Sequence, residues 1–249
     1  MKISIITVVW NNKDTIKDAI DSVLAQTYEN IEYIIIDGAS SDGTVEIVKS
    51  YGNKITKFLS EKDNGLYDAM NKGIVQATGD IVGILNSDDF YIDEFVIEKV
   101  VQEFKDKEVD SLFADLVFVK PENLDKTVRY YDSSHFRPEK FAYGWMPAHP
   151  TFFVRKEIYD KYGTFKLDYK IAADYEILVR FLQKYKISYT YLNQVIIKMR
   201  LGGISTNGVK SNYILNKEII RACRENGIST SWVKVLSKYP KKMLGLFKK

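Results

Sequence analysis

Four consecutive polar residues follow a short apolar run that begins at Ile81: Asn86, Ser87, Asp88 and Asp89. An apolar run of this length is typical of a strand buried on both faces of a parallel sheet. Open α/β sheets bind ligands at the carboxyl ends of their strands, where adjacent carboxylates can hold a divalent cation against a phosphate. Oxygen ligands favour Mg²⁺ or Mn²⁺ over zinc. The alternative is that Asp88 and Asp89 only cap a helix that begins near Asp93.

The segments before this run predict the rest of the sheet. Strands rich in β-branched residues are expected at 2–10, 31–37 and 55–60. Apolar residues at helical spacing predict helices around 16–24, 45–48 and 70–77. Asp42 should cap the second of these helices and Gly79 should end the third. Because strand and helix alternate with short connections, we expect right-handed crossovers and a Rossmann-like, doubly wound, mostly parallel α/β sheet with helices on both faces.

The carboxyl ends of these strands should lie along one edge of the sheet. They are marked by Asn11, Asp37 and Asp88. An acidic residue that closes the second strand is a common way to bind the ribose or base of a nucleotide. The turn after the first strand contains no glycine, so a dinucleotide fingerprint and a P-loop are both absent. Dehydrogenases and P-loop kinases are therefore excluded, and a metal must carry the charge of any bound phosphates.

Composition limits the remaining classes of protein. The chain has 249 residues, a single cysteine and two histidines, so neither an internal disulfide nor a zinc site is expected. It has no apolar run long enough to span a membrane and no signal-peptide pattern after Lys2, which favours a cytoplasmic protein. The net charge is +3, but residues 232–249 contain six lysines and no acid, so the rest carries −3. We therefore expect no nucleic-acid partner.

Four segments of the first 90 residues resemble, in order, motifs of the family 2 glycosyltransferases with the GT-A fold. They are Ser4-Ile-Ile-Thr-Val-Val-Trp-Asn-Asn12, Asp37-Gly-Ala-Ser-Ser-Asp-Gly-Thr44, Glu61-Lys-Asp-Asn-Gly-Leu-Tyr-Asp-Ala-Met-Asn71 and Gly79-Asp-Ile-Val-Gly-Ile-Leu-Asn-Ser-Asp-Asp89. Each segment is weak alone, but their combination is specific. The resemblance is to the enzymes that build bacterial polysaccharides and O-antigens.

The resemblance implies a set of residues that bind a nucleoside-diphosphate sugar: Thr7, Val9, Asn11, Asp37, Asp63, Asn64, Tyr67, Asn71, Asn86, Ser87 and Arg200. Asp88 would be the metal ligand of the family's D-x-D motif, whose first Asp is replaced here by Asn86. Arg200, in the Gly-rich loop 199–206, would face the diphosphate. The alternative for residues 64–68 is ordinary turn chemistry, with Asp68 favouring the start of a helix.

The second half of the chain is expected to complete the site. A helix is expected at 96–104. Strands at 109–120 and 127–131 should form the mixed part of the sheet. They are followed by a long loop, 132–150, of a length often found in lids. Residues 148–153 resemble a segment of the bacterial polysaccharide enzymes. His149 in this segment, together with Asp89, is a candidate contact to the acceptor or the phosphates, although a lone His is as often structural.

A second motif supplies the candidate catalytic residue. Residues 173–180, Ala-Asp-Tyr-Glu-Ile-Leu-Val-Arg, resemble the family's E-D-x-x-L-x-x-R segment, with Ala173 in place of Glu. The resemblance implies that Asp174 is the general base. Its place at the start of a helix should favour the ionised form and make it a weaker base. The alternative is that Asp174 only caps this helix.

These features together predict an inverting, Mn²⁺- or Mg²⁺-dependent enzyme that moves a sugar from a nucleoside diphosphate, most simply UDP, to a hydroxyl of a glycan or lipid-linked glycan. The expected domain is 1–209, with a nucleotide-sugar half (1–106) and an acceptor half (107–209), followed by a C-terminal helical acceptor-side segment (210–249). Apolar residues alternate with lysines in 232–249, which suits contact with the inner face of the cell membrane or, alternatively, a docked tail. Two alternatives for function are a sugar-nucleotide pyrophosphorylase and an inactive sugar-nucleotide-binding protein. The first lacks its Gly-rich loop, and Asp88 and Asp174 argue against the second.

Overall fold

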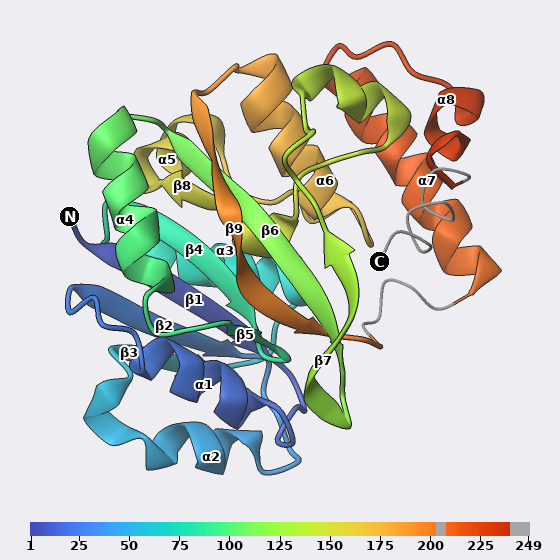
Figure 1. The fold of residues 1–249 in the computed structure, drawn as a ribbon. Coiled ribbons are helices and arrows are strands. Elements are labelled where there is room, and N and C mark those ends of the chain that lie inside the picture. Colours follow the sequence, from blue (N-terminus) through green and yellow to red (C-terminus); the bar gives the residue numbers. More distant parts are fainter. Residues whose placement is uncertain (203–207, 240–249) are drawn as a thin grey trace.

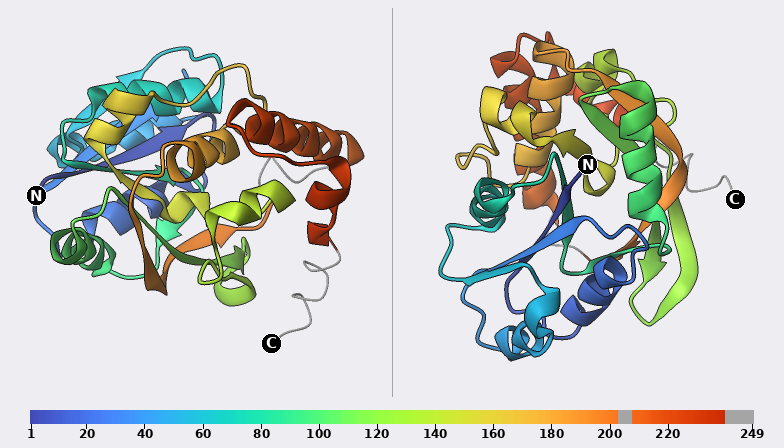
Figure 2. Two further views of the ribbon diagram at one scale, coloured as in Figure 1. Left: turned by 90° about the horizontal axis from the view of Figure 1, so that it is seen from above. Right: turned by 90° about the vertical axis from the view of Figure 1, so that its left-hand side faces the viewer.

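A computed structural model of the chain describes residues 1–202 and 208–239 (Figure 1). Its centre is a sheet with the strand order β3-β2-β1-β4-β8-β6-β9-β5, with β7 paired to β6. Helices cover both faces of this sheet (Figure 2). The predicted α/β fold class is confirmed.

The strands are β1 (Ile3–Val9), β2 (Ile31–Asp37), β3 (Lys57–Ser60), β4 (Ile81–Asn86), β5 (Asp89–Tyr91), β6 (Ser111–Lys120), β7 (Asn123–Tyr131), β8 (Phe153–Arg155) and β9 (Tyr189–Arg200). The α-helices are α1 (Ile16–Leu24), α2 (Thr44–Ser50), α3 (Leu66–Gln76), α4 (Val96–Lys107), α5 (Lys156–Tyr162), α6 (Ala173–Leu178), α7 (Val209–Glu225) and α8 (Trp232–Leu236). Short helical turns are η1 (Gly52–Lys54), η2 (Pro138–Tyr143), η3 (His149–Thr151) and η4 (Val179–Lys184), the last of which is π-helical.

The first half of the chain forms the parallel part of the sheet. β1 lies between β2 and β4, with Val9 opposite Asp37 and Val8 opposite Asn86. All seven residues of β1 are buried, because helices cover both of its faces. The register brings the polar ends of β2 and β4 to the same edge of the sheet, one on each side of β1.

The second half forms the mixed part of the sheet. β8 is antiparallel to both β4 and β6, so β6 runs in the same direction as the parallel strands. The long strand β9 pairs in parallel with β6 and antiparallel with β5, which places Asp89 opposite Met199. No local pattern predicted the pairing of β5 with β9, and it is what fixes the residues after Asp88 in an extended conformation.

The helices pack into two hydrophobic cores, one on each face of the sheet. The apolar faces of α1, α2 and α4 pack on one side of the sheet, and those of α3, α5, α6 and α7 pack on the other. Figure 1 shows α7 and α8 together at one end of the molecule, next to η2. Within the described ranges, no helix is both long and apolar enough to cross a membrane.

The structure corrects one local prediction and rules out one alternative. α3 ends at Gln76, and Gly79 instead packs against β1, where a Cβ would lie 2.7 Å from the backbone nitrogen of Ser4. Asp88 and Asp89 do not cap α4, which begins at Val96 and whose preceding turn is closed by Asp93.

The predicted contact of Asp42 with the start of α2 is present, since its carboxylate accepts hydrogen bonds from the N–H and the hydroxyl of Thr44. Most of the predicted Gly-rich loop (203–206) and the end of the basic tail (240–249) lie outside the described residues.

Candidate active site

Three buried oxygens at the carboxyl edge of the parallel strands have no hydrogen-bond partner among the described residues: Asp37 Oδ1, Asn86 Oδ1 and Asp89 Oδ1. The other oxygen of Asp37 accepts hydrogen bonds from the N–H of Ser40 (3.0 Å) and the hydroxyl of Ser60 (2.6 Å). Buried polar atoms are nearly always paired, and each unpaired one costs about 1–3 kcal/mol. Their concentration at one edge indicates that a ligand supplies hydrogen-bond donors or a cation here.

The turn between β4 and β5 places two carboxylates next to each other. Asp89 is fully buried, and Asn86 donates a hydrogen bond to its Oδ2 (3.3 Å). Burial and the adjacent Asp88 carboxylate hold the pKa of Asp89 well above its usual range. Asp88 itself is partly exposed. A bound cation would therefore remove a repulsion that this turn otherwise contains.

The side chains of this turn fit a metal that binds together with a nucleotide. Among residues 1–202 and 208–239, no three His, Cys, Asp or Glu side chains come together as a metal site. The donors present are the Asp88 carboxylate and the unpaired oxygens of Asn86 and Asp89. One or two carboxylates, completed by phosphates and water, are what Mg²⁺ uses at nucleotide sites.

Arg200 is hydrogen-bonded to the turn between β4 and β5. Its Nη1 donates to the backbone carbonyl of Asp88 (2.6 Å), and its Nη2 pairs with the carboxylate of Asp18. The side chain is 7% exposed and lies over the ring of Phe90. Both terminal nitrogens of the guanidinium are therefore engaged within the protein. The predicted contact of Arg200 with the diphosphate stays a prediction, whereas its support of the Asp88 turn is visible.

The loops after β1 and β3 bring Trp10 and Asp63 to the end of β2. Asp63 accepts a hydrogen bond from the N–H of Gly65 (2.8 Å), and a Cβ on Gly38 would lie 2.5 Å from its other oxygen. That Cβ would also lie 3.3 Å from Trp10 Cδ1, so a side chain at Gly38 would displace Asp63 and crowd Trp10. Trp10 is 66% exposed. Trp10 and Gly38 were not singled out from the sequence. A Trp that directly follows an apolar strand was a usable signal for Trp10.

Asn11 links the first two loops at this edge. Its backbone has a φ of 45°, in the left-handed region that Asn tolerates. Its N–H donates to Ser40 Oγ (2.7 Å), and its Oδ1 accepts from the N–H of Ser41 (2.8 Å). Asn11 therefore connects the loop after β1 to the loop that follows Asp37, and its contact with a nucleotide stays a prediction.

Other predicted binding residues lie beneath the edge. Thr7 is fully buried, with its hydroxyl 3.0 Å from that of Tyr33, and Val9 belongs to the core under α1. Ser87 accepts a hydrogen bond from Asn12 Nδ2 (2.8 Å). These residues shape the floor of the site, and their direct contact with a nucleotide stays a prediction.

Asn71 and Asn64 are engaged in backbone contacts. Asn71 donates to the carbonyl of Phe165 and accepts from its N–H, both at 2.8 Å. The N–H of Asn64 donates to Asp68 (2.9 Å), which is the turn chemistry that the sequence left open. Asn71 thus joins α3 to the segment that leads into α6, a role that no local pattern indicated.

Asp174 lies in the first turn of α6, but it is not the N-cap, which is Ala172. Its Oδ1 accepts from the N–H of Tyr175 (2.7 Å). Burial raises the pKa of Asp174 to about 6; the hydrogen bond from the N–H of Tyr175 opposes the rise, and the negative charge of Glu218 adds to it. We predicted that the helix terminus would make Asp174 a weaker base. Burial outweighs that effect, so the carboxylate is a stronger base than an ordinary Asp.

A row of aromatic rings lies near the start of α6. Tyr67 stacks on Phe165 (5.6 Å between ring centroids), and its hydroxyl donates to the carbonyl of Ile171 (2.5 Å). The ring of His149 meets Phe165 edge-on at 5.7 Å, and η3, which carries His149, packs against α6. Burial lowers the pKa of His149 to about 4, so this side chain is neutral near pH 7. It can form hydrogen bonds with an acceptor, but it does not supply a positive charge for phosphates.

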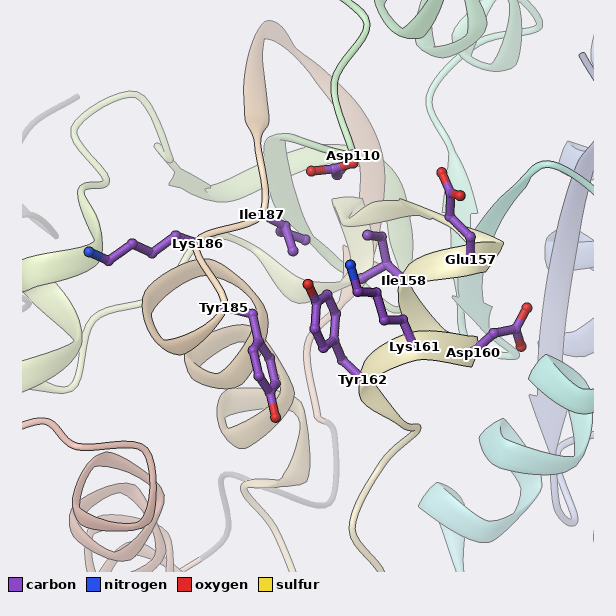
Figure 3. Close-up of a pocket in the computed structure, with 9 residues that line it drawn as sticks. All are labelled: Asp110, Glu157, Ile158, Asp160, Lys161, Tyr162, Tyr185, Lys186 and Ile187. Atoms are coloured by element: carbon purple, nitrogen blue, oxygen red, sulfur yellow. The ribbon is translucent and has the colours of Figure 1, made fainter.

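A separate surface pocket of about 610 Å³ lies at the other edge of the sheet, by the amino end of β6. Figure 3 shows Tyr162 and Lys161 from α5 on one side of it, with Tyr185 and Ile187 on the other. No predicted site residue lines this pocket. The polar edge that carries Asp37, Asn86 and Asp89 therefore remains the candidate active site.

Residues 4–163 match the family model described as "Glycosyl transferase family 2". The chain belongs to this family. An uncharacterized glycosyltransferase of Mycobacterium tuberculosis is 33% identical over 180 residues, covering 72% of this chain and 68% of the relative. An uncharacterized glycosyltransferase of Rickettsia typhi is 29% identical over 88% of this chain and 70% of its own length. The predicted resemblance is confirmed, and this glycosyltransferase is an enzyme of the class that the sequence indicated.

Solved structures confirm the GT-A fold of this family 2 glycosyltransferase. The S. aureus TarS 1–349 structure in complex with UDP matches with a TM-score of 0.68 and 18% identity, over 89% of this chain and 65% of that one. The chain therefore spans about two thirds of that structure. The mannosyltransferase PcManGT of Pyrobaculum calidifontis, in complex with GDP-Man and Mn²⁺, matches with a TM-score of 0.62 and 16% identity, over 99% of this chain and 81% of that one.

Proposed function

We propose that this glycosyltransferase transfers a sugar, with inversion, from a nucleoside diphosphate to a hydroxyl of a glycan or lipid-linked glycan. The observation that carries the proposal is the row of unpaired buried oxygens on Asp37, Asn86 and Asp89. An unpaired carboxylate oxygen on Asp37 calls for a ligand that brings a hydrogen-bond donor, as the N–H of uracil or a ribose hydroxyl does. Trp10, exposed beside Asp63, offers an aromatic face on which a base can stack.

The metal belongs beside the diphosphate. Asp88 would hold Mn²⁺ or Mg²⁺, with the free oxygens of Asn86 and Asp89 next to it. When bound, the ion neutralises the charge that develops on the leaving diphosphate. The protein's own contribution is to hold the Asp88 turn in place, through Arg200 and through the pairing of β5 with β9.

Asp174 is the proposed general base. A sugar hydroxyl is too weak an acid to ionise at neutral pH, so a carboxylate must accept its proton as the hydroxyl attacks the anomeric carbon. With a pKa of about 6, Asp174 is mostly ionised at pH 7 and still accepts a proton readily. In a single displacement by this hydroxyl, the anomeric configuration inverts. Tyr67 and neutral His149 border the space where the acceptor would lie.

Relatives and structural neighbours support a nucleotide-sugar donor. S. aureus TarS has been solved in complex with UDP and with UDP-GlcNAc, and PcManGT in complex with GDP-Man and Mn²⁺. A relative from Mycobacterium bovis, 24% identical over 88% of this chain and 82% of its own length, is named as a PGL/p-HBAD biosynthesis glycosyltransferase. We favour UDP as the nucleotide.

The test is release of nucleoside diphosphate from a panel of UDP- and GDP-sugars, with Mn²⁺, with Mg²⁺ and with EDTA. We expect release from at least one UDP-sugar, dependent on the metal and lost in Asp174→Asn. Release that is unchanged by EDTA would contradict the metal assignment. Activity with GDP-sugars alone would replace UDP by GDP and leave the rest of the proposal in place.

We also propose that the C-terminal segment contacts an anionic membrane surface, which would bring the enzyme to a lipid-linked acceptor. α8 and the elements next to it expose Trp232, Val233, Tyr213 and Tyr143. Trp232 stacks on Tyr213 (5.6 Å), and Lys234 lies over the ring of Tyr143 (5.9 Å). Exposed aromatic side chains next to lysines suit the headgroup region of a membrane. The inner face of the cell membrane is the expected location.

Co-sedimentation with vesicles decides this second proposal. We would compare the full chain with a chain ending at residue 239 and with a Tyr213→Ser/Trp232→Ser double variant, on vesicles with and without phosphatidylglycerol. We expect the full chain to bind the anionic vesicles and both variants to bind less. Equal sedimentation of all three proteins would rule the membrane contact out.

A further inference from the structure

One face of α7 holds the segment that leads into α6. Three α7 residues, spaced at i, i+3 and i+7, bond to residues 166–172: Glu218, Arg221 and Glu225. Residues at this spacing lie on the same side of a helix. The segment ends directly before α6, which carries Asp174 in its first turn. A helix beyond the part of the chain that matches the family model therefore supports the proposed base.

Glu218 makes the central contact. Its two carboxylate oxygens accept hydrogen bonds from three consecutive backbone N–H groups, those of Lys170 (2.8 Å), Ile171 (2.9 Å) and Ala172 (2.9 Å). The Glu218 side chain is 8% exposed, so these are charge-assisted bonds with little competition from water. From the other side, the hydroxyl of Tyr67 donates to the carbonyl of Ile171. The two residues before α6 are thus fixed by α7 and α3 together.

The other two residues of this face hold the start of the segment. Arg221 pairs with the carboxylate of Asp168, and Glu225 accepts from Lys166 Nζ and from the Tyr169 hydroxyl, both at 2.9 Å. Glu225 and Arg221 also pair with each other (2.7 Å). These contacts are more exposed than those of Glu218 and lie farther along the chain from Asp174. They therefore provide a natural comparison for the Glu218 contact.

We propose that Glu218 is a positioning residue of the glycosyl transfer, which sets both the place and the electrostatic surroundings of the Asp174 carboxylate. The proposal rests on the proposed role of Asp174 as general base. Glu218 does not touch the reacting atoms. It acts through the backbone of residues 170–172 and through its negative charge.

The charged and titratable groups around Asp174 come from several elements. α3 supplies Tyr67, β7 supplies Tyr131, η3 carries the neutral His149, and α7 supplies Glu218. Glu176, on α6 itself, is buried and paired with Arg180 and Lys166. Glu218 is therefore the anion in this set that forms no ion pair with a described residue, and its charge favours the protonated form of Asp174. Removing that charge should make Asp174 easier to ionise, so the pKa of Asp174 should fall.

The test is the pH profile of kcat for Glu218→Gln, with Glu225→Gln as the matched control. In Glu218→Gln the amide nitrogen cannot accept a hydrogen bond, so the segment shifts and kcat should fall roughly tenfold or more. The KM for the donor should stay unchanged, because Glu218 bonds to residues 170–172 and not to the edge that carries Asp37, Asn86 and Asp89. The decrease of kcat on the acid side should move to lower pH. Glu225→Gln removes one negative charge from the same helix face and should leave the acid side of the profile where it is.

The outcomes separate this inference from the proposed function. An acid side of the profile that stays in place in Glu218→Gln overturns the inference, and so does an equal shift in Glu225→Gln. If Asp174→Asn keeps both turnover and the acid-side decrease, the base assignment itself fails. If Glu218→Gln does not fold, Glu218→Asp replaces it in the test. The Asp side chain keeps the charge but is shorter, so kcat should fall while the acid side of the pH profile stays in place. Wild-type kcat in Glu218→Asp also overturns the positioning role.

Discussion

Two regions of the molecule are built in opposite ways. One is the donor edge, the edge of the sheet that carries Asp37, Asn86 and Asp89, and the other is the segment before α6. At the donor edge, Asp37, Asn86 and Asp89 each keep one buried oxygen without a partner among the described residues. Before α6, three consecutive backbone N–H groups are all bonded to Glu218. The first region leaves its polar atoms for a ligand to satisfy. The second uses its polar atoms to hold a single carboxylate, Asp174, in place.

This difference has an energetic consequence. Each unpaired buried oxygen costs about 1–3 kcal/mol, which a bound nucleotide and metal can recover. The paired segment before α6 gains nothing comparable from a ligand. Substitutions at the donor edge should therefore act mainly on binding, and substitutions around Asp174 mainly on turnover.

The largest effect is expected for Asp174→Asn. Loss of the base should lower kcat by roughly 10²- to 10⁴-fold while the affinity for UDP stays within a few-fold of wild type. Steady-state kinetics and calorimetry with UDP and Mn²⁺ measure the two quantities separately. A folded Asp174→Asn enzyme with turnover near wild type would contradict the assignment, and Glu176 is then a poor replacement because it is paired and buried.

Asp88→Asn should show the reverse pattern at the donor edge. Because Asp88 supplies the charged metal ligand, the variant should lose the gain in UDP affinity that Mn²⁺ provides, roughly 10- to 100-fold. Asp93→Asn is the matched control, since Asp93 lies in the same segment but pairs with Lys99. Calorimetry with and without Mn²⁺ measures the effect. An unchanged Mn²⁺ dependence in Asp88→Asn would remove Asp88 from the metal site.

The donor edge was predictable because its information is local. β2 has the predicted bounds, 31–37, and β2 and β4 each end at a polar residue, Asp37 and Asn86. Parallel pairing then brings Asp37 and Asn86 to one edge without any further information. The family resemblance added roles to residues whose position was already implied.

The support of the site was not predictable, because its contacts join distant parts of the chain. Asn71 bonds to Phe165, 94 residues away, and Arg200 pairs with Asp18, 182 residues away. A resemblance assigns such residues to the ligand, because a motif does not show what else the side chain touches. The raised pKa of Asp174 escaped for the same reason, since the burial that causes it comes from the tertiary structure.

Asn71→Ala tests whether Asn71 supports the fold through Phe165 or binds the nucleotide. It leaves the N–H and the carbonyl of Phe165 without their partner, which should cost about 1–3 kcal/mol of stability and lower Tm by several degrees. The affinity for UDP should change little. Asn64→Ala, at an exposed residue of the loop before α3, is the control and should leave Tm nearly unchanged. A large loss of UDP affinity with wild-type Tm would instead support direct nucleotide binding by Asn71.

The smallest expected effect is a change in how protein stability depends on pH when Asp174 is replaced. The pKa of Asp174 is raised from an ordinary value near 4 to about 6, so folding favours its protonated form. The stabilisation is complete below about pH 4 and is lost as pH rises through 6. Asp174→Asn is neutral throughout, so it should be more stable than wild type at pH 8. Because Asp174 is partly exposed, water screens the effect, and we expect about 1–2 kcal/mol. The advantage should shrink toward pH 5.

Thermal unfolding of wild type and Asp174→Asn at pH 5 and pH 8 measures this difference as a few degrees in Tm. Asp168→Asn is the control, because Asp168 lies in the same segment but is exposed and paired with Arg221. If Asp174 served only as a helix cap, its Asn variant would show no advantage at pH 8, since Asn caps as well as Asp. A higher Tm at pH 8 that fades at pH 5 would show that the protein keeps a destabilising carboxylate at this position, as expected of a residue retained for its chemistry.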